Sequence, residues 1–173
     1  MAPLYHMMDY EKAEDVFKNN AMPARWEHDI PGYGKVKGNS FTRNKNPRIF
    51  WGRPVRLIMN QQVLASRNKI IPLDGEIVFA NGRGVRSDPD RIMNSSLHNQ
   101  FAEEFVVGDI RPLHKMISLI ELREANFYLL SGRNAVALLE FTQAYCEKYN
   151  VPLQIDPKFS EQIDEIKRRW AED

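Results

Sequence analysis

Apolar side chains recur at helical spacing near both ends of the chain. Ala13, Val16 and Phe17 stand at i, i+3 and i+4, so one face of a helix that follows Asp9 is expected to pack inward. A similar apolar face recurs in the last third of the chain, and Asp156-Pro157 is typical of a helix start. The helices predicted in this way cover about 9–20, 134–149 and 156–170.

Between these helices the apolar residues fall into short runs, several of them alternating with polar residues, and such runs predict strands. The segment 21–37 is rich in Pro, Gly and charge and predicts a loop, as does the long segment 74–100; 61–67 predicts a short helix or turn. Helices at the ends and strands in the middle indicate an α+β fold. The predicted strands are 4–8, 38–42, 54–59, 69–72, 101–107, 116–122, 126–130 and 151–155.

A chain of 173 residues fits one domain with at most a small appendage. The strand-rich part ends before the last two helices. We therefore expect a domain over 1–130 and a C-terminal helical extension over 131–173 that packs on the same domain.

Several classes of protein are not supported by the sequence. No run approaches the roughly 20 apolar residues of a membrane span, and no secretory signal opens the chain, so a cytoplasmic protein without a membrane partner is expected. Cys146 is the single cysteine, and no two of the four histidines share a helical metal spacing, so no metal site is expected. Phosphate-loop, dinucleotide-binding and serine-hydrolase motifs are also missing.

Charge is unevenly distributed although the net charge is only +1. Lys and Arg dominate the segment Arg25–Arg56, whereas the C-terminal part is acidic. A basic segment indicates an anionic partner, and both a phosphate-bearing ligand and a nucleic acid fit that description.

Three short motifs carry the candidate chemistry, and they occur in a fixed order. Leu4-Tyr5-His6 opens the chain, Gly38-Asn39-Ser40-Phe41-Thr42-Arg43 is a strand-like run with two hydroxyls, and Phe101-Ala102-Glu103-Glu104-Phe105 carries two adjacent carboxylates. Because side chains alternate along a strand, only one of these two glutamates can share a face with a given neighbour.

These motifs resemble those of the ADP-ribosyltransferase fold, and the nearest likeness is to the DarT-type nucleic-acid ADP-ribosyltransferases. The resemblance spans roughly 4–122. It implies a split, mostly antiparallel sheet with helices at the N- and C-terminal ends, and a mono-ADP-ribosyltransferase, which is a kind of glycosyltransferase. The substrate it implies is NAD, and a nucleic-acid base or a protein is the candidate acceptor.

The resemblance also implies roles for individual residues. Either Glu103 or Glu104 is the catalytic carboxylate, and the resemblance favours Glu103. A carboxylate beside the ribose would stabilise the positive charge that develops when the nicotinamide–ribose bond breaks. Phe41 points to the face opposite Ser40, so it cannot both pack in the core and stack on nicotinamide. The residues expected to bind NAD are Tyr5, His6, Ser40, Phe41, Thr42, Arg43, Arg48 and Trp51.

The loop that leads into the glutamates presents the acceptor in such transferases. In this chain it carries Arg83, Arg86 and Arg91, which we expect to contact the acceptor, because arginines suit nucleic-acid phosphates or an acidic protein surface.

Two other interpretations are compatible with the sequence. Met8 stands where many members of the family carry a threonine, which favours a non-catalytic module that binds nucleic acid or protein through the basic segment Arg25–Arg56. The C-terminal helices would also suit a structural role within an assembly, with Phe159 and Trp170 at the contact.

Overall fold

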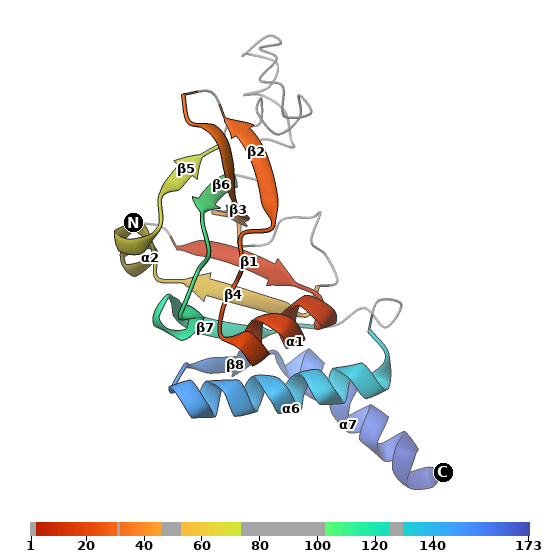
Figure 1. Cartoon of the computed structure of the whole chain (residues 1–173). Coiled ribbons are helices and arrows are strands. Elements are labelled where there is room, and N and C mark those ends of the chain that lie inside the picture. The colour runs from red at the N-terminus through yellow and green to blue at the C-terminus, as the bar shows by residue number, and fades with distance from the viewer. Residues whose placement is uncertain (1–2, 31, 46–52, 74–102, 125–129) are drawn as a thin grey trace.

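The computed structural model of the chain describes residues 3–30, 32–45, 53–73, 103–124 and 130–173. The described residues form an α+β fold with a sheet of eight strands (Figure 1). In chain order the elements are β1 (Leu4–Met8), α1 (Tyr10–Asn19), β2 (Trp26–Ile30), β3 (Gly34–Thr42), β4 (Val55–Met59), α2 (Gln61–Arg67), β5 (Ile70–Pro72), β6 (Glu103–Val107), a 3-10 turn (Leu113–Lys115), β7 (Ile117–Leu122), α6 (Gly132–Tyr149), β8 (Leu153–Ile155) and α7 (Pro157–Glu172).

The sheet consists of two halves that meet at one point. The strand order is β5-β6-β3-β1-β4-β7-β8, with β2 paired to β3, and each pair is antiparallel except β7 with β8. β1 pairs with β4 along its whole length, but it pairs with β3 only where Tyr5 lies opposite Thr42. The strands of the two halves run in different directions (Figure 1). The split, mostly antiparallel sheet predicted from the sequence is therefore confirmed.

Capping residues mark where the helices begin and end. The side chain of Asp9 accepts a hydrogen bond from the backbone N–H of Lys12 at 2.9 Å and caps α1, and Asn20 ends α1 in the left-handed conformation. Asp156 caps α7 in the same way, with Pro157 in its first turn. These caps are why the sequence located the helix ends closely.

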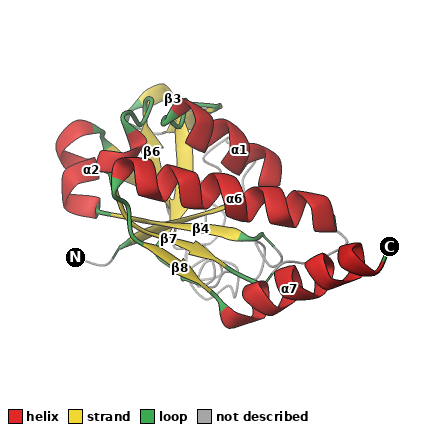
Figure 2. Ribbon diagram, turned by 90° about the horizontal axis from the view of Figure 1, so that it is seen from below, coloured by secondary structure: helices red, strands yellow, loops and turns green. Residues whose placement is uncertain are grey.

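One continuous core joins the N-terminal helix to the C-terminal part of the chain. Val16 and Phe17 of α1 share a buried cluster with Leu138 and Tyr145 of α6, and Phe159 of α7 belongs to it as well. Figure 2 shows α6 and α1 side by side over the strands. β8 extends the sheet beyond β7. The division into a domain over 1–130 and an extension over 131–173 stays a prediction.

The prediction of a loop over 21–37 is wrong, because β2 and the first half of β3 form a hairpin there. Its charged side chains lie opposite one another in register, Glu27 with Lys37 and Asp29 with Lys35. Opposite charges at such positions stabilise a strand pair although little apolar surface is buried. The hairpin therefore lacks the apolar alternation that marks a strand in a sequence. The strand predicted over 126–130 lies outside the described residues except for Leu130.

Gly38 lies on β3 where the backbone of β6 approaches closely. A Cβ atom at this position would come within 2.0 Å of the carbonyl oxygen of Val106, so any side chain forces the two strands apart. We expect Gly38→Ala to lower the free energy of unfolding by about 1–3 kcal/mol, the usual cost of overpacking. Urea denaturation would measure the loss. In Gly132→Ala the added Cβ meets only the flexible side chain of Ile166, at 3.3 Å, so a loss as large as that of Gly38→Ala would contradict this expectation.

Candidate functional site

His6 lies on β1 beside the point where the sheet splits, and both of its ring nitrogens are engaged. Its Nδ1 is 2.9 Å from the backbone oxygen of Ser40, and its Nε2 is 2.8 Å from Nζ of Lys12. A carbonyl only accepts and an ammonium only donates, so Nδ1 carries the proton and Nε2 accepts. Burial, and after it the charge of Lys12, lowers the pKa of His6 to about 3. The ring is therefore neutral and held in one tautomer.

Ser40 and Glu103 form the closest contact between two of the predicted motifs. Oγ of Ser40 donates a hydrogen bond to Oε1 of Glu103 at 2.5 Å. Phe105 lies directly opposite Ser40 in the β3–β6 pair, and Glu103 is two residues before it, so all three share one face of the sheet. Burial raises the pKa of Glu103, and the hydrogen bond from Ser40 and the charge of His28 act against that rise.

Glu104 points to the opposite face of β6, where it forms an ion pair with Arg43. Its side chain is 8% exposed and accepts a hydrogen bond from Nε of Arg43 at 2.7 Å. Arg43 also donates through Nη1 to Oε1 of Gln61 at 3.0 Å. The structure therefore separates the two glutamates. It also directs Arg43 toward Glu104 and α2, although the sequence led us to expect it to bind NAD.

The remaining residues of the first two motifs have different positions. Phe41 is 2% exposed and packs in the main core with its ring centroid 5.0 Å from that of His6, so it is no longer a candidate for stacking on a ligand. Thr42 shares the face of Ser40, but its Oγ1 accepts a hydrogen bond from the backbone N–H of Asn44 and stabilises the turn after β3. Tyr5 is half-buried and lies opposite Thr42.

A cavity of about 470 Å³ opens beside His6 and Ser40. Ser40 lines it and donates to Glu103, which places the carboxylate one side chain from the cavity. Trp26 is 62% exposed at its edge. The other lining residues are Asp9, Glu11, Lys12, Arg25, Asn39 and Arg53, so three cations from three separate segments of the chain converge here.

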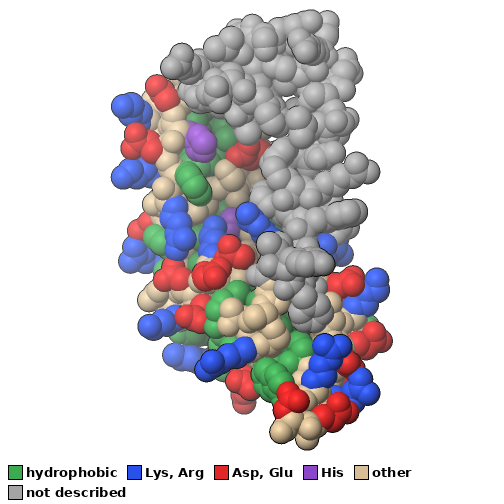
Figure 3. All heavy atoms as spheres, turned by 90° about the vertical axis from the view of Figure 1, so that its right-hand side faces the viewer, with side chains coloured by type: hydrophobic (Ala, Val, Ile, Leu, Met, Phe, Trp, Pro, Cys, Tyr) green, Lys and Arg blue, Asp and Glu red, His purple; other side chains and the backbone are tan. Residues whose placement is uncertain are grey.

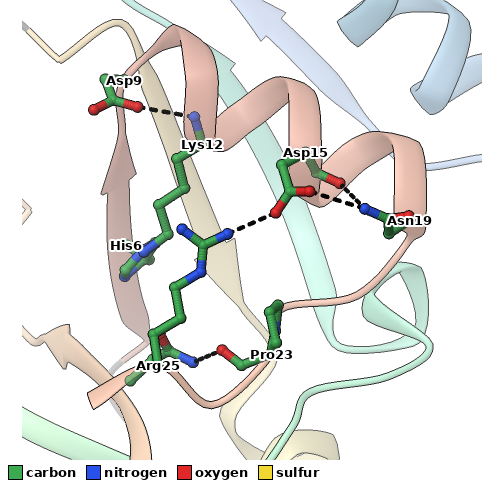
Figure 4. Close-up of polar contacts among 8 residues, drawn as sticks. His6, Asp9, Lys12, Asp15, Asn19, Pro23 and Arg25 are labelled. Carbon is green, nitrogen blue, oxygen red and sulfur yellow. Dashed lines mark hydrogen bonds and ion pairs between the residues drawn. The ribbon is translucent and has the colours of Figure 1, made fainter.

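The cations of this cavity lie close enough to influence one another. Burial, and after it the charges of Arg25 and Arg53, lowers the pKa of Lys12 to about 8. Arg25 forms an ion pair with Asp15 at 2.6 Å, and its guanidinium lies beside the side chain of Lys12 (Figure 4). On the face of the molecule shown in Figure 3, Lys and Arg side chains gather beside a histidine. Such a cluster favours an anionic ligand.

The sequence pointed to some of these cavity residues and missed others. Arg25 and Trp26 fall within a basic segment that contains aromatic residues, which is a recognisable sign of a binding surface. Lys12 gave no such sign, because a lysine near the start of an amphipathic helix usually faces solvent. Its position at the cavity depends on how α1 packs above β1.

Five residues predicted for the site, Arg48, Trp51, Arg83, Arg86 and Arg91, lie outside the described residues, and their roles stay predictions. Within the described ranges, no group of three or more His, Cys, Asp or Glu side chains could hold a metal ion. None of the helices described is both long and apolar enough to cross a membrane.

The hydrogen bond from Ser40 gives a prediction for the ionisation of Glu103. We expect Ser40→Ala to raise the pKa of Glu103 further, because a donor to a carboxylate favours its charged form. A carboxyl-carbon NMR titration would measure the shift, with the Glu103 signal assigned by its loss in Glu103→Gln. Ser118, whose hydroxyl donates to the backbone oxygen of Ile58, is a suitable control. An unchanged pKa in Ser40→Ala, or an equal rise in Ser118→Ala, would contradict the expectation.

Comparison with known proteins identifies the fold of the chain. No protein-family model and no curated protein matches the chain. Among solved structures, Thermus sp. 2.9 DarT in complex with NAD+ is similar, with a TM-score of 0.58 and 13% identity over 91% of this chain and 96% of that chain. The complex of the same protein with ADP-ribosylated ssDNA gives a TM-score of 0.56 at 13% identity, over 91% and 95% of the two chains. The chain therefore has the fold of DarT, as the sequence motifs predicted.

Proposed function

We propose that the protein is an NAD-dependent ADP-ribosyltransferase that modifies a macromolecule. The observation that carries this proposal is the hydrogen bond between Ser40 and Glu103, beside the buried His6, at the split of a DarT-like sheet. Three motifs that are far apart in the sequence supply these residues. His6 and Ser40 line one cavity and Glu103 contacts Ser40, an arrangement that suits an NAD-cleaving site.

Glu103 is the catalytic residue of this proposal. Breaking the bond between nicotinamide and ribose leaves positive charge on the ribose, and a carboxylate fixed beside it stabilises that charge. Ser40 holds Glu103 through one oxygen at 2.5 Å, which leaves the other carboxylate oxygen for the ribose or the acceptor. Because Glu103 is half-buried, water competes less with its interaction with that charge than it would at an exposed carboxylate.

The lining of the cavity fits NAD in charge and in hydrogen bonding. Lys12, Arg25 and Arg53 provide cations for a diphosphate, and the exposed Trp26 offers a ring face for a planar group. Oδ1 of Asn39 is buried and has no hydrogen-bond partner among the residues described, although its Nδ2 donates to the backbone oxygen of Pro23. A ligand N–H would satisfy this acceptor, and NAD carries such groups on both of its bases.

We infer that the acceptor is a nucleic acid. The similar Thermus DarT structures include a complex with ADP-ribosylated ssDNA. Arg83, Arg86 and Arg91 precede Glu103 in the sequence, and arginines there would bind phosphates of an approaching strand. Such a transfer makes the protein a glycosyltransferase, and we place its activity in the cytoplasm, where NAD and nucleic acid are both present.

Incubation with NAD tests this function directly. The protein is mixed with NAD labelled in its adenylate part and with single-stranded DNA, duplex DNA, RNA or a protein extract. We expect nicotinamide release together with transfer of the label to the nucleic acid. Absence of both would overturn the proposal, and salt-dependent nucleic-acid binding without nicotinamide release would favour the non-catalytic binding module.

A further inference from the structure

Lys12 and His6 both line the cavity and contact each other. Lys12 lies in the first turn of α1, and its side chain reaches down to Nε2 of His6 at 2.8 Å (Figure 4). The second ring nitrogen of His6 donates to the backbone oxygen of Ser40. His6 therefore has no ring nitrogen left for a ligand, whereas an ammonium has three N–H donors and His6 takes only one of them.

We infer that Lys12 binds the diphosphate of NAD, and that His6 acts as a positioning residue for Lys12. This inference rests on the proposed function, because it takes NAD as the ligand. The hydrogen bond with His6 fixes the end of a long side chain that would otherwise sample many rotamers, so little conformational entropy remains to be lost on binding.

The charges around Lys12 explain why this position favours an anion. Arg25 and Arg53 both destabilise its charged form, so a ligand phosphate would relieve a repulsion within the protein. Other groups also face Lys12: neutral His6 from β1, Asp9 from the helix cap, and Glu11 from the cavity lining. Arg25 is exposed and already paired with Asp15, whereas Lys12 is half-buried, so Lys12 is the more deeply placed cation of the two.

A pH dependence of binding follows from this arrangement. The pKa of Lys12 is lowered to about 8, so the protein loses this charge as the pH rises through that value. A bound phosphate raises the pKa again, so binding near that pH takes up a proton. Guanidinium groups keep their charge in this range and His6 is already neutral, so the change is expected to follow Lys12.

Calorimetric titration with NAD and with ADP-ribose, at pH values below and above the Lys12 pKa, tests the inference. For the wild type we expect affinity to fall as the pH rises through about 8. Lys12→Met is expected to bind about 10- to 100-fold more weakly below that pH and to show no such fall. The affinity of Lys12→Arg for NAD is expected to stay constant over this pH range, because the arginine keeps its charge. Proton uptake, measured in two buffers of different ionisation enthalpy, gives a readout independent of turnover.

Two controls make the outcome specific to the diphosphate. Lys18 is an exposed lysine on the same helix, and Lys18→Met should leave binding unchanged. Adenosine has no phosphate, so its affinity should be equal in the wild type and in Lys12→Met. An equal loss of affinity for adenosine in Lys12→Met would overturn the inference. So would a loss of affinity seen only with a single-stranded oligonucleotide, or a pH dependence of NAD binding retained in Lys12→Met.

Failure of this inference is distinguishable from failure of the proposed function. If the wild type neither binds NAD nor releases nicotinamide, both are overturned. If the wild type releases nicotinamide in a reaction that requires Glu103, while Lys12→Met binds NAD and ADP-ribose as tightly as the wild type, only the role of Lys12 is overturned.

Discussion

Glu103→Gln is expected to lower the rate of nicotinamide release by about 100-fold or more while the protein remains folded. Gln keeps the shape of the side chain and can still accept the hydrogen bond that Ser40 donates at 2.5 Å. It lacks the negative charge, which is the property that stabilises a positively charged ribose. The rate at saturating NAD and the affinity for NAD should be measured separately, since the loss is expected in the rate.

The stability of this variant supplies an independent check. Burial raises the pKa of Glu103, so the protonated carboxyl group is favoured in the folded state. The stability that it contributes in acid is lost as the pH rises through the pKa of the folded state. Glu103→Gln should therefore be at least as stable as the wild type at neutral pH, and this advantage should disappear in acid, where Glu103 is protonated. Thermal unfolding at several pH values would show this.

Glu27 provides a matched control for the loss of one carboxylate. It lies on β2, paired in register with Lys37, and its side chain is exposed. Glu27→Gln should retain the activity of the wild type. Full activity in Glu103→Gln would remove Glu103 from the mechanism. An equal loss in both variants would show that the effect comes from the net charge of this surface.

The arrangement of Glu103 and its neighbours was largely predictable because their motifs depend on local patterns. Alternation along a strand places Glu103 and Glu104 on opposite faces, whatever the rest of the fold. The same alternation separates Phe41 from Ser40. Which glutamate shares a face with Ser40 could not be deduced from alternation alone, because it depends on the register between β3 and β6. The pairing of Thr42 with Glu103 settles it.

The positions of the cationic side chains were less predictable because they depend on contacts between distant segments. Arg43 pairs with Glu104 across 61 residues of sequence, and no periodic pattern marks such a pair. Lys12 lies on α1, Arg25 directly precedes β2, and Arg53 precedes β4. Only the packing of these segments brings the three side chains to one cavity. Composition gave the sign of the charge in this half of the chain, and the fold decides where it accumulates.

Glu121→Gln is expected to destabilise the protein by about 3–5 kcal/mol, the usual cost of leaving a buried charge without its partner. Arg56 and Glu121 lie opposite each other on β4 and β7, and each is less than a tenth exposed. Nε of Arg56 donates to Oε2 of Glu121 at 2.6 Å, and Nη2 donates to the same oxygen. At about 2–4 °C per kcal/mol for a chain of this size, the Tm should fall by roughly 6–20 °C.

A double variant separates the charge effect from the loss of a contact. Arg56→Met combined with Glu121→Leu removes both charges, and apolar replacement of a buried pair is often neutral, so most of the lost stability should return. Glu165→Gln breaks an exposed pair with Arg168 on α7, and no measurable loss is expected there. A double variant as unstable as Glu121→Gln would contradict this account. Because Arg56 and Glu121 belong to the half of the sheet that lacks Glu103, Glu121→Gln should keep the nicotinamide release rate of the wild type at temperatures well below its own transition.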